Sequence, residues 1–289
     1  MMRITLWFIC ISISISGIAQ VGSEIYLFDM EVSKSEITVR NPVNVTNHPD
    51  YDNQPSFHKS ESILYYSSFN EDGRADIKAY NFETEESISF TNTQEREYSP
   101  TVTPDGEFIS CIIQRDNDAQ DLGKYPIGGG EPITLIDDLI VGYHAWVDQQ
   151  NLILFVLGEP ATLGWYDLKS GSNEVLGQNI GRSLHKIPGE PAMSFVQKAE
   201  GKFWEIKRLD IRTREVSSIT KTLDGREDLA WTEDGKILMS DGKGLFFFDT
   251  KRSSKWRPVK VESAGVEFKN VTRLAISHDG KKLALVSEE

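Results

Sequence analysis

Two histidines, His144 and His185, occur at matching places in the chain and could together bind a metal ion. Each lies near the start of a predicted apolar strand, in neighbouring copies of a repeat described below. Imidazole is a common ligand of transition metals. Neither histidine belongs to an HxH or HxxxH pair, however. We therefore predict no metal and no cofactor, and keep these two histidines as the candidate ligands if a metal does bind. In the alternative interpretation, each packs or hydrogen-bonds at the edge of its strand.

The chain offers no motif for a catalytic nucleophile, and we predict no catalytic residues. A Gly-x-Ser-x-Gly turn, typical of one class of serine hydrolases, does not occur. The run 128–130 consists of three glycines but lacks the Lys-Ser/Thr pair of a phosphate-binding loop. The acidic run 116–121 has Asp121 where a calcium-binding loop has its glycine. We interpret both runs as solvated turns.

Polar and aromatic residues also gather at the start of each of six predicted strands. Tyrosine and arginine are favoured at binding hot spots. If these six strand starts converge in space, their side chains form one binding surface for a ligand or partner. In the alternative interpretation they form a ring of solvated loops. The candidate binding residues are Asp52, Asn53, Glu97, Tyr98, Tyr143, His144, Arg182, His185, Arg226, Glu227 and Arg273.

A repeat of about 45 residues defines these strands. Its clearest copy is SPTVTPDGEFISCII at 99–113, where an apolar strand, a Pro-Asp-Gly turn and a second strand form a hairpin. Related hairpins begin near residues 54, 144, 184, 229 and 274. The aligned position of the first strand falls at 57, 102, 146, 186, 231 and 276, which gives spacings of 45, 44, 40, 45 and 45. It is apolar in every copy except at Lys186, where a one-residue shift to Ile187 is possible. Cys111 lies in the alternating apolar run that forms the second strand of the hairpin at 99–113, and we predict it to be a buried, inert thiol.

A second pattern alternates with the first and determines the architecture. It consists of an aromatic-rich strand, a polar turn and another short strand, and its six copies begin near residues 24, 76, 121, 162, 203 and 244. Four short strands per repeat of this length are typical of a β-propeller blade. The chain starts with the second half of a repeat and ends with the first half of one. We predict an all-β, six-bladed propeller of four-stranded antiparallel blades, with one blade shared between the two ends. An open superhelix would not need these complementary half-units.

The motifs themselves resemble the WD40-like repeat of the TolB propeller family. The resemblance rests on Ser99-Pro100, Pro104-Asp105-Gly106, Asp234-Gly235 and Asp279-Gly280, and on the strand endings Leu27-Phe28-Asp29, Trp165-Tyr166-Asp167 and Phe247-Phe248-Asp249. It implies a TolB-like propeller fold over nearly the whole chain. TolB itself binds a peptidoglycan-associated lipoprotein, and similar propellers occur in prolyl oligopeptidase-like enzymes and pectin-fragment lyases. We see no TolB-type N-terminal domain or hydrolase domain here, and expect a stand-alone propeller at 20–289.

The N-terminal residues predict export. Arg3 precedes an apolar stretch at 4–18, and Gly17-Ile18-Ala19 supplies the small residues of a signal peptidase site. We predict that a signal peptide, 1–19, is cleaved before Gln20 and that the protein is periplasmic or secreted. The alternative, a membrane anchor, requires a longer apolar run. We predict no transmembrane segment in the mature chain.

The net charge of the protein limits the kinds of partner that it can bind. The net charge is −13, and removing 1–19 also removes Arg3 and leaves −14. A nucleic-acid partner is excluded, because phosphate binding needs a basic surface. We expect a monomer that binds an envelope protein or glycan at the channel mouth, with a basic segment on the partner as one possibility. The rival hypothesis is a metal-dependent polysaccharide lyase or small hydrolase acting at the same mouth.

Overall fold

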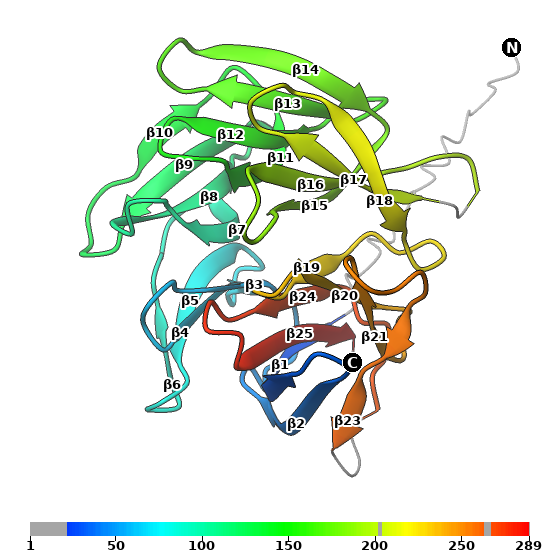
Figure 1. Cartoon of the computed structure of the whole chain (residues 1–289). Coiled ribbons are helices and arrows are strands. Elements are labelled where there is room, and N and C mark those ends of the chain that lie inside the picture. Colours follow the sequence, from blue (N-terminus) through cyan, green and yellow to red (C-terminus); the bar gives the residue numbers. More distant parts are fainter. Residues whose placement is uncertain (1–21, 202–203, 263–266, 289) are drawn as a thin grey trace, which may run out of the picture.

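The computed structural model describes residues 22–201, 204–262 and 267–288, and every regular element in these ranges is a strand. The predicted signal peptide, residues 1–19, lies outside them. The strands form six sheets arranged around a common centre (Figure 1). Within the described ranges, no helix has the length and apolar character that a membrane crossing requires. The predicted six-bladed propeller is confirmed.

Five blades repeat one pattern, in which four successive strands pair antiparallel from the innermost strand to the outermost. Blade 1 contains β3 (Asp52–Phe57), β4 (Ile63–Phe69), β5 (Ala75–Asn81) and β6 (Glu86–Ser89). Blade 2 contains β7 (Arg96–Val102), β8 (Phe108–Gln114), β9 (Gln120–Pro126) and β10 (Ile133–Ile136). Blade 3 contains β11 (Val141–Trp146), β12 (Asn151–Val156), β13 (Thr162–Asp167) and β14 (Ser172–Gln178). Blade 4 contains β15 (Ile180–Lys186), β16 (Ala192–Gln197), β17 (Glu205–Asp210) and β18 (Val216–Lys221). Blade 5 contains β19 (Leu229–Trp231), β20 (Lys236–Ser240), β21 (Leu245–Asp249) and β22 (Arg257–Pro258).

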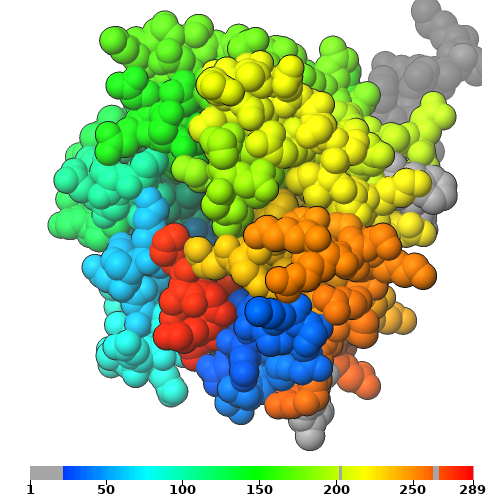
Figure 2. Space-filling model, viewed as in Figure 1, coloured from blue at the N-terminus to red at the C-terminus, as the bar shows by residue number. Residues whose placement is uncertain are grey.

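The sixth, closing blade combines strands from both parts of the chain. Its inner pair is β24 (Arg273–Ile276) and β25 (Lys282–Glu288), and its outer pair is β1 (Ser23–Val32) and β2 (Ile37–Asn44). Strands β1 and β25 pair antiparallel over seven residue pairs, from Ser23 opposite Glu288 to Asp29 opposite Lys282. In the space-filling view, the C-terminal segment in red lies directly against the N-terminal segment in blue (Figure 2). This pairing confirms the predicted shared blade, and the ring is closed.

A fifth strand covers the outer edge of the closing blade. Strand β23 (Lys260–Glu262) follows blade 5 in the chain and pairs parallel with β2, with Val261 opposite Val39. The repeat pattern did not predict it. Since an unpaired outer edge can recruit other strands, β23 protects the blade in which the chain ends meet.

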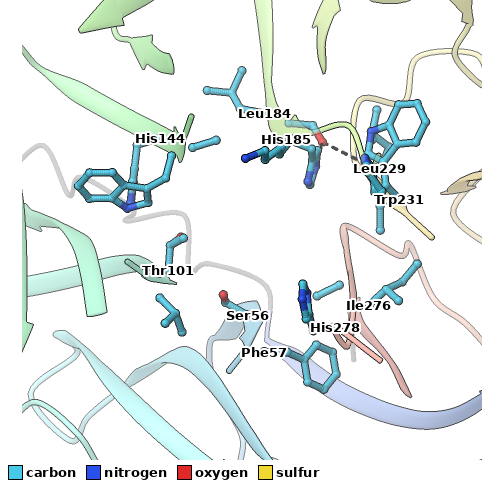
Figure 3. A pocket seen from close by; sticks show the side chains of 18 of the residues that line it. Ser56, Phe57, Thr101, His144, Leu184, His185, Leu229, Trp231, Ile276 and His278 are labelled. Atoms are coloured by element: carbon cyan, nitrogen blue, oxygen red, sulfur yellow. Dashed lines mark hydrogen bonds between the residues drawn. The ribbon is translucent and has the colours of Figure 1, made fainter. Parts of the chain in front are cut away.

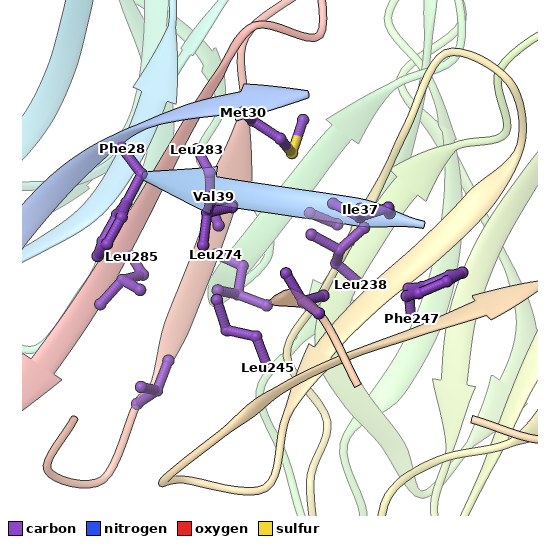
Figure 4. Packing of buried hydrophobic residues seen from close by; sticks show 13 residues of the cluster. Phe28, Met30, Ile37, Val39, Leu238, Leu245, Phe247, Leu274, Leu283 and Leu285 are labelled. Carbon is purple, nitrogen blue, oxygen red and sulfur yellow. The ribbon is translucent and has the colours of Figure 1, made fainter. Parts of the chain in front are cut away.

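The apolar core lies between neighbouring blades. Alternate side chains along each strand point to the face of the sheet that packs against the next blade. The cluster between the closing blade and blade 5 includes Phe28, Ile37, Leu238, Phe247 and Leu285 (Figure 4). Phe28, Ile37 and Leu285 have no exposed surface. Cys111 is also fully buried, which confirms the prediction, and burial raises the pKa of its thiol well above the ordinary value.

Two tryptophans at equivalent repeat positions tie inner strands to the preceding blade. The indole Nε1 of Trp146 donates to Ser110 Oγ at 2.9 Å, and that of Trp231 donates to Ser194 Oγ at 2.9 Å. Both serines are fully buried on the second strand of the preceding blade. These hydrogen bonds fix the inner strands that line the central channel.

Candidate functional site

A central cavity of about 1130 Å³ is enclosed by the six innermost strands. Going round the ring, β3, β7, β11, β15, β19 and β24 contact one another in that order. Each of the six contributes side chains to the cavity wall (Figure 3). A concave site lined by every blade is the default binding site on this fold.

A hydrogen-bonded cluster that we call the floor spans one end of the cavity. It consists of Tyr143, Arg182, Asp228 and Arg273, all near the starts of inner strands. Asp228 accepts hydrogen bonds from Arg182 Nη2 at 3.1 Å and from Arg273 Nη1 at 2.9 Å. Arg273 Nη2 donates to the Tyr143 hydroxyl at 3.0 Å. Since β24 and β11 are three blades apart in a ring of six, this last bond crosses the channel.

Two more tyrosines pack beside the floor. Tyr51 and Tyr98 meet edge to face, with ring centroids 6.5 Å apart. Burial raises the pKa of Tyr51. The nearby positive charges of Arg273 and Arg182 oppose this shift, which places Tyr51 close to the floor. Inner strands from all six blades thus bring an aromatic or charged side chain to this end. The cavity is therefore a cup that opens at the other end, where the inner strands finish.

The walls of the cup are largely apolar, and its opening is charged. Phe57, Leu184, Trp231 and Ile276 line the wall (Figure 3). Charged and ionisable residues that line the cavity near the ends of the inner strands are Lys59, Asp148, Lys186, Glu190, Glu233 and His278. Such a surface suits an apolar segment that enters from the open end.

The structure divides the predicted binding residues into two groups. Those that line the cup are Tyr143, His144, Arg182, His185 and Arg273. Those outside its lining are Asp52, Asn53, Glu97, Tyr98, Arg226 and Glu227. The strand starts do converge, as expected, but their side chains contact one another, and Arg273 bonds Tyr143 across the channel. Their contact with a partner stays a prediction.

Two carboxylates of the outer group are buried inside the blades. Glu97 has no exposed surface and accepts hydrogen bonds from Thr91, Thr93 and Tyr125. Burial raises its pKa, against the effect of these hydrogen bonds. Asp52 is 1% exposed, and burial raises its pKa to about 6. The Glu97 side chain is thus engaged in internal hydrogen bonds, whereas Asp52 Oδ2 is buried without a hydrogen-bond partner and lies 3.8 Å from His48 Nδ1.

Arg226 and Glu227 hold the neighbouring loops and the floor in place. Arg226 donates to Asn270 Oδ1 at 2.8 Å and to the carbonyl of Asp241 at 2.7 Å. Glu227 accepts the backbone N–H of Arg182 at 2.9 Å and lies 3.0 Å from Lys198 Nζ. Both residues act as supports around the cup.

His144 is held by a buried serine. Its Nε2 lies 2.8 Å from Ser110 Oγ, which also accepts the Trp146 indole N–H and donates to the Thr101 carbonyl at 3.0 Å. Because the Ser110 hydrogen is used on Thr101, His144 donates from Nε2, and Nδ1 carries a lone pair. That buried Nδ1 has no hydrogen-bond partner. Burial lowers the pKa of His144 to about 4, so the ring is neutral at pH 7.

His185 forms a hydroxyl–imidazole pair with Ser183, two residues before it on the same strand. Its Nε2 lies 2.9 Å from Ser183 Oγ, and both residues line the cup. Ser183 Oγ also accepts the backbone N–H of Leu229 at 3.2 Å. Burial lowers the pKa of His185 to about 4. The sequence motifs did not reveal this pair.

Among the described residues, no three His, Cys, Asp or Glu side chains are grouped so that they could hold a metal ion. His144 and His185 each direct Nε2 to a serine rather than to a common point. The described residues therefore offer no third ligand that would join His144 and His185 in a metal site.

The neutral His144 predicts an acid-sensitive fold. Between the ordinary pKa of 6.5 and the folded value of about 4, the unfolded chain binds the proton first, so stability falls as pH decreases through this range. The shift corresponds to about 3 kcal/mol at full effect. Asp52, with a raised pKa, acts in the opposite direction. His185, whose pKa is also lowered to about 4 by burial, acts in the same direction as His144. We therefore expect His144→Gln to reduce, but not abolish, the slope of unfolding free energy between pH 6.5 and 4, measured by urea titration. His278→Gln, an exposed control, should keep the parent slope, and equal slopes for all three proteins would contradict the prediction.

Sequence reasoning placed Asp228 among the strand starts but did not single it out as a candidate, and it missed Tyr51. It also did not assign the wall residues Phe57, Trp231 and Ile276 to a site, although they occupy the aligned position of the repeat. The alignment of the repeats could have identified these wall residues, because the same repeat position faces the channel in every blade. Ser183 and His185 could have been linked by their two-residue spacing, which places both on one face of a strand.

Comparison with known proteins agrees with this architecture. The sequence matches no protein-family model and no curated protein. Among solved structures, a putative TolB from Agrobacterium tumefaciens is similar with a TM-score of 0.72 and 13% identity, over 94% of this chain and 99% of that one. TolB from Acinetobacter baumannii has a TM-score of 0.58 and 15% identity over 93% of this chain, which spans 64% of that protein. An oligogalacturonate lyase in complex with manganese has a TM-score of 0.53 and 14% identity, over 94% and 99% of the two chains. The protein therefore has the TolB-like six-bladed propeller fold that its repeats predicted.

Proposed function

We propose that the protein is a binding or scaffolding protein of the cell envelope, and that it takes a segment of a partner protein or glycan into the cup. The observation that carries this proposal is the central cavity itself, with largely apolar walls lined by all six blades. Tyr143, His144, Arg182, His185 and Arg273 are the predicted binding residues that this cavity can present to an occupant.

Export is part of the proposal. It is supported by the pattern of residues 1–19 and by the likeness to TolB structures. The mature chain then begins at Gln20. Amino-terminal sequencing of the protein recovered from the envelope fraction tests this step, and a chain that retains Arg3 would contradict it.

Site-specific crosslinking tests the binding site. We expect a photoreactive amino acid at Phe57 or Ile276, in the cup wall, to capture a defined partner from native envelope. The same group at Ile88 or Val216, which are exposed on outer strands, serves as the control. Tyr143→Ala should weaken capture at the wall by about tenfold or more if it is a hot spot. Capture from the outer strands alone would place the binding site elsewhere.

A small hydrolase is the second candidate, because Ser183 and His185 meet inside the cup. A neutral imidazole 2.9 Å from a hydroxyl can accept its proton, although Ser183 Oγ also accepts a backbone N–H. Ester hydrolysis by the parent that is lost in Ser183→Ala, with unchanged melting, would favour this candidate. Stoichiometric metal that is lost in His144→Ala would favour the metal-dependent lyase instead.

A further inference from the structure

The closed end of the cup carries an excess of positive charge in an otherwise acidic protein. Among the residues that the structure describes, Arg182, Arg273 and Lys198 form ion pairs there with two carboxylates, those of Asp228 and Glu227. The whole chain has a net charge of −13. A cationic group in a confined, partly buried site attracts an anion more strongly than a solvated one does.

Arg182 has a hydrogen-bond donor that the protein leaves unused. Its Nε is buried and has no hydrogen-bond partner, since the nearest Glu227 oxygen lies 3.6 Å away. Its Nη2 is bonded to Asp228. Arg273, by contrast, already bonds Asp228, the Thr272 carbonyl and the Tyr143 hydroxyl. The Arg182 side chain as a whole is 33% exposed, so the accessible part of its guanidinium can donate to an acceptor on an incoming group, while the buried Nε faces Glu227.

The shape of the cup determines how a chain can enter. The floor bond between Arg273 and Tyr143 crosses the channel and obstructs the passage of an occupant through it, which favours a chain that ends inside. The six inner strands pair on one side only, which leaves their channel edges without a strand partner. An extended peptide can use such edges, while its side chains pack on apolar walls.

We propose, on the basis of the proposed function, that the cup receives the free C-terminal end of an extended partner polypeptide. Its apolar side chains lie along Phe57, Trp231 and Ile276, and its terminal carboxylate meets Arg182 at the floor. An N-terminal ammonium would face the arginines and be repelled. The apolar walls favour a peptide over an acidic glycan as the source of the carboxylate.

Two peptide pools test this assignment on the parent protein. Random octapeptides with free carboxyl ends, and the same pool with carboxamide ends, are each passed over the immobilised mature protein, and the retained peptides are quantified by mass spectrometry. We expect the carboxylate pool to be enriched about tenfold over the amide pool, as one charge-assisted hydrogen bond would give. This comparison requires no variant and is independent of any folding defect.

A matched pair of variants locates the effect. Arg182→Gln removes the charge that lines the cup, whereas Arg226→Gln makes the same change outside its lining. We expect Arg182→Gln to abolish the preference for carboxylate ends and Arg226→Gln to retain it, with folding of both checked by thermal melting.

Equal retention of the two pools, no retention of either, or a preference that survives in folded Arg182→Gln would each overturn the assignment. Binding of a tetragalacturonate at the wall, with neither pool retained, would overturn it in favour of an acidic glycan. The crosslinking experiment at Phe57 and Ile276 is separate. A partner captured there without a carboxylate preference leaves the proposed function standing and rejects only the C-terminal mode.

Discussion

A variant that lacks residues 25–39 is expected to lose cooperative unfolding. The deletion removes most of β1 and the start of β2, and β1 is the strand that joins β2 to β25. It also removes the buried side chains of Ile25, Phe28, Ile37 and Val39. At about 1.5–3 kcal/mol for each buried side chain, the loss is comparable with the whole stability of a typical domain.

Circular dichroism during heating measures this outcome. We expect a broad, non-cooperative transition or aggregation, because an edge of β25 is left unpaired. A synthetic peptide of residues 22–45, added in excess, is the matched control and should restore a sharp transition. A deletion variant that melts sharply near the parent temperature without the peptide would refute the role of the shared blade.

The second large effect is expected at Asp228, the only carboxylate that both floor arginines donate to within the described residues. Asp228→Ala leaves Arg182 and Arg273 without this acceptor in a partly buried site. Removing one partner of a buried ion pair is strongly destabilising. We expect a loss of about 3 kcal/mol in unfolding free energy, measured by urea denaturation.

Asp224→Ala, an exposed change in the same loop, should cost less than about 0.5 kcal/mol. Adding Arg273→Gln to Asp228→Ala should recover part of the loss, because one unpaired charge is removed, and a double-mutant cycle measures the coupling. If Asp228→Ala is as stable as the control, the floor contributes no net stability.

The blades could be predicted from the sequence because they depend on short-range patterns. Each hairpin carries its own turn, such as Pro104-Asp105-Gly106, and alternating apolar residues fix which face of a strand is buried. The offset between the two half-repeats was enough to pair β1 with β25. The local turns and apolar alternation therefore predict the same arrangement of strands that the whole structure has.

The site could be predicted only in part, because its contacts depend on side chains brought together across the ring. Arg273 bonds Tyr143, 130 positions away in the chain, and no spacing in the repeat links these two residues. The repeat placed both at the same end of the channel but did not show whether they face outward or meet. Strand β23 was missed for a related reason, since its parallel pairing with β2 follows no repeat.

The shared blade has a consequence for how the chain reaches its native state. Strands β1 and β2 are synthesised first, yet their inner partner β25 is synthesised last. Blades 1 to 5 consist of consecutive hairpins and can form in order as the chain emerges. Until β25 has been synthesised, β1 and β2 lack this partner, and apolar side chains such as Phe28 and Val39, which are buried in the native fold, stay exposed to solvent. Because closing so long a loop is slow, ring closure is expected to be the late step of folding, and this waiting segment is the part of the chain that a chaperone would need to bind.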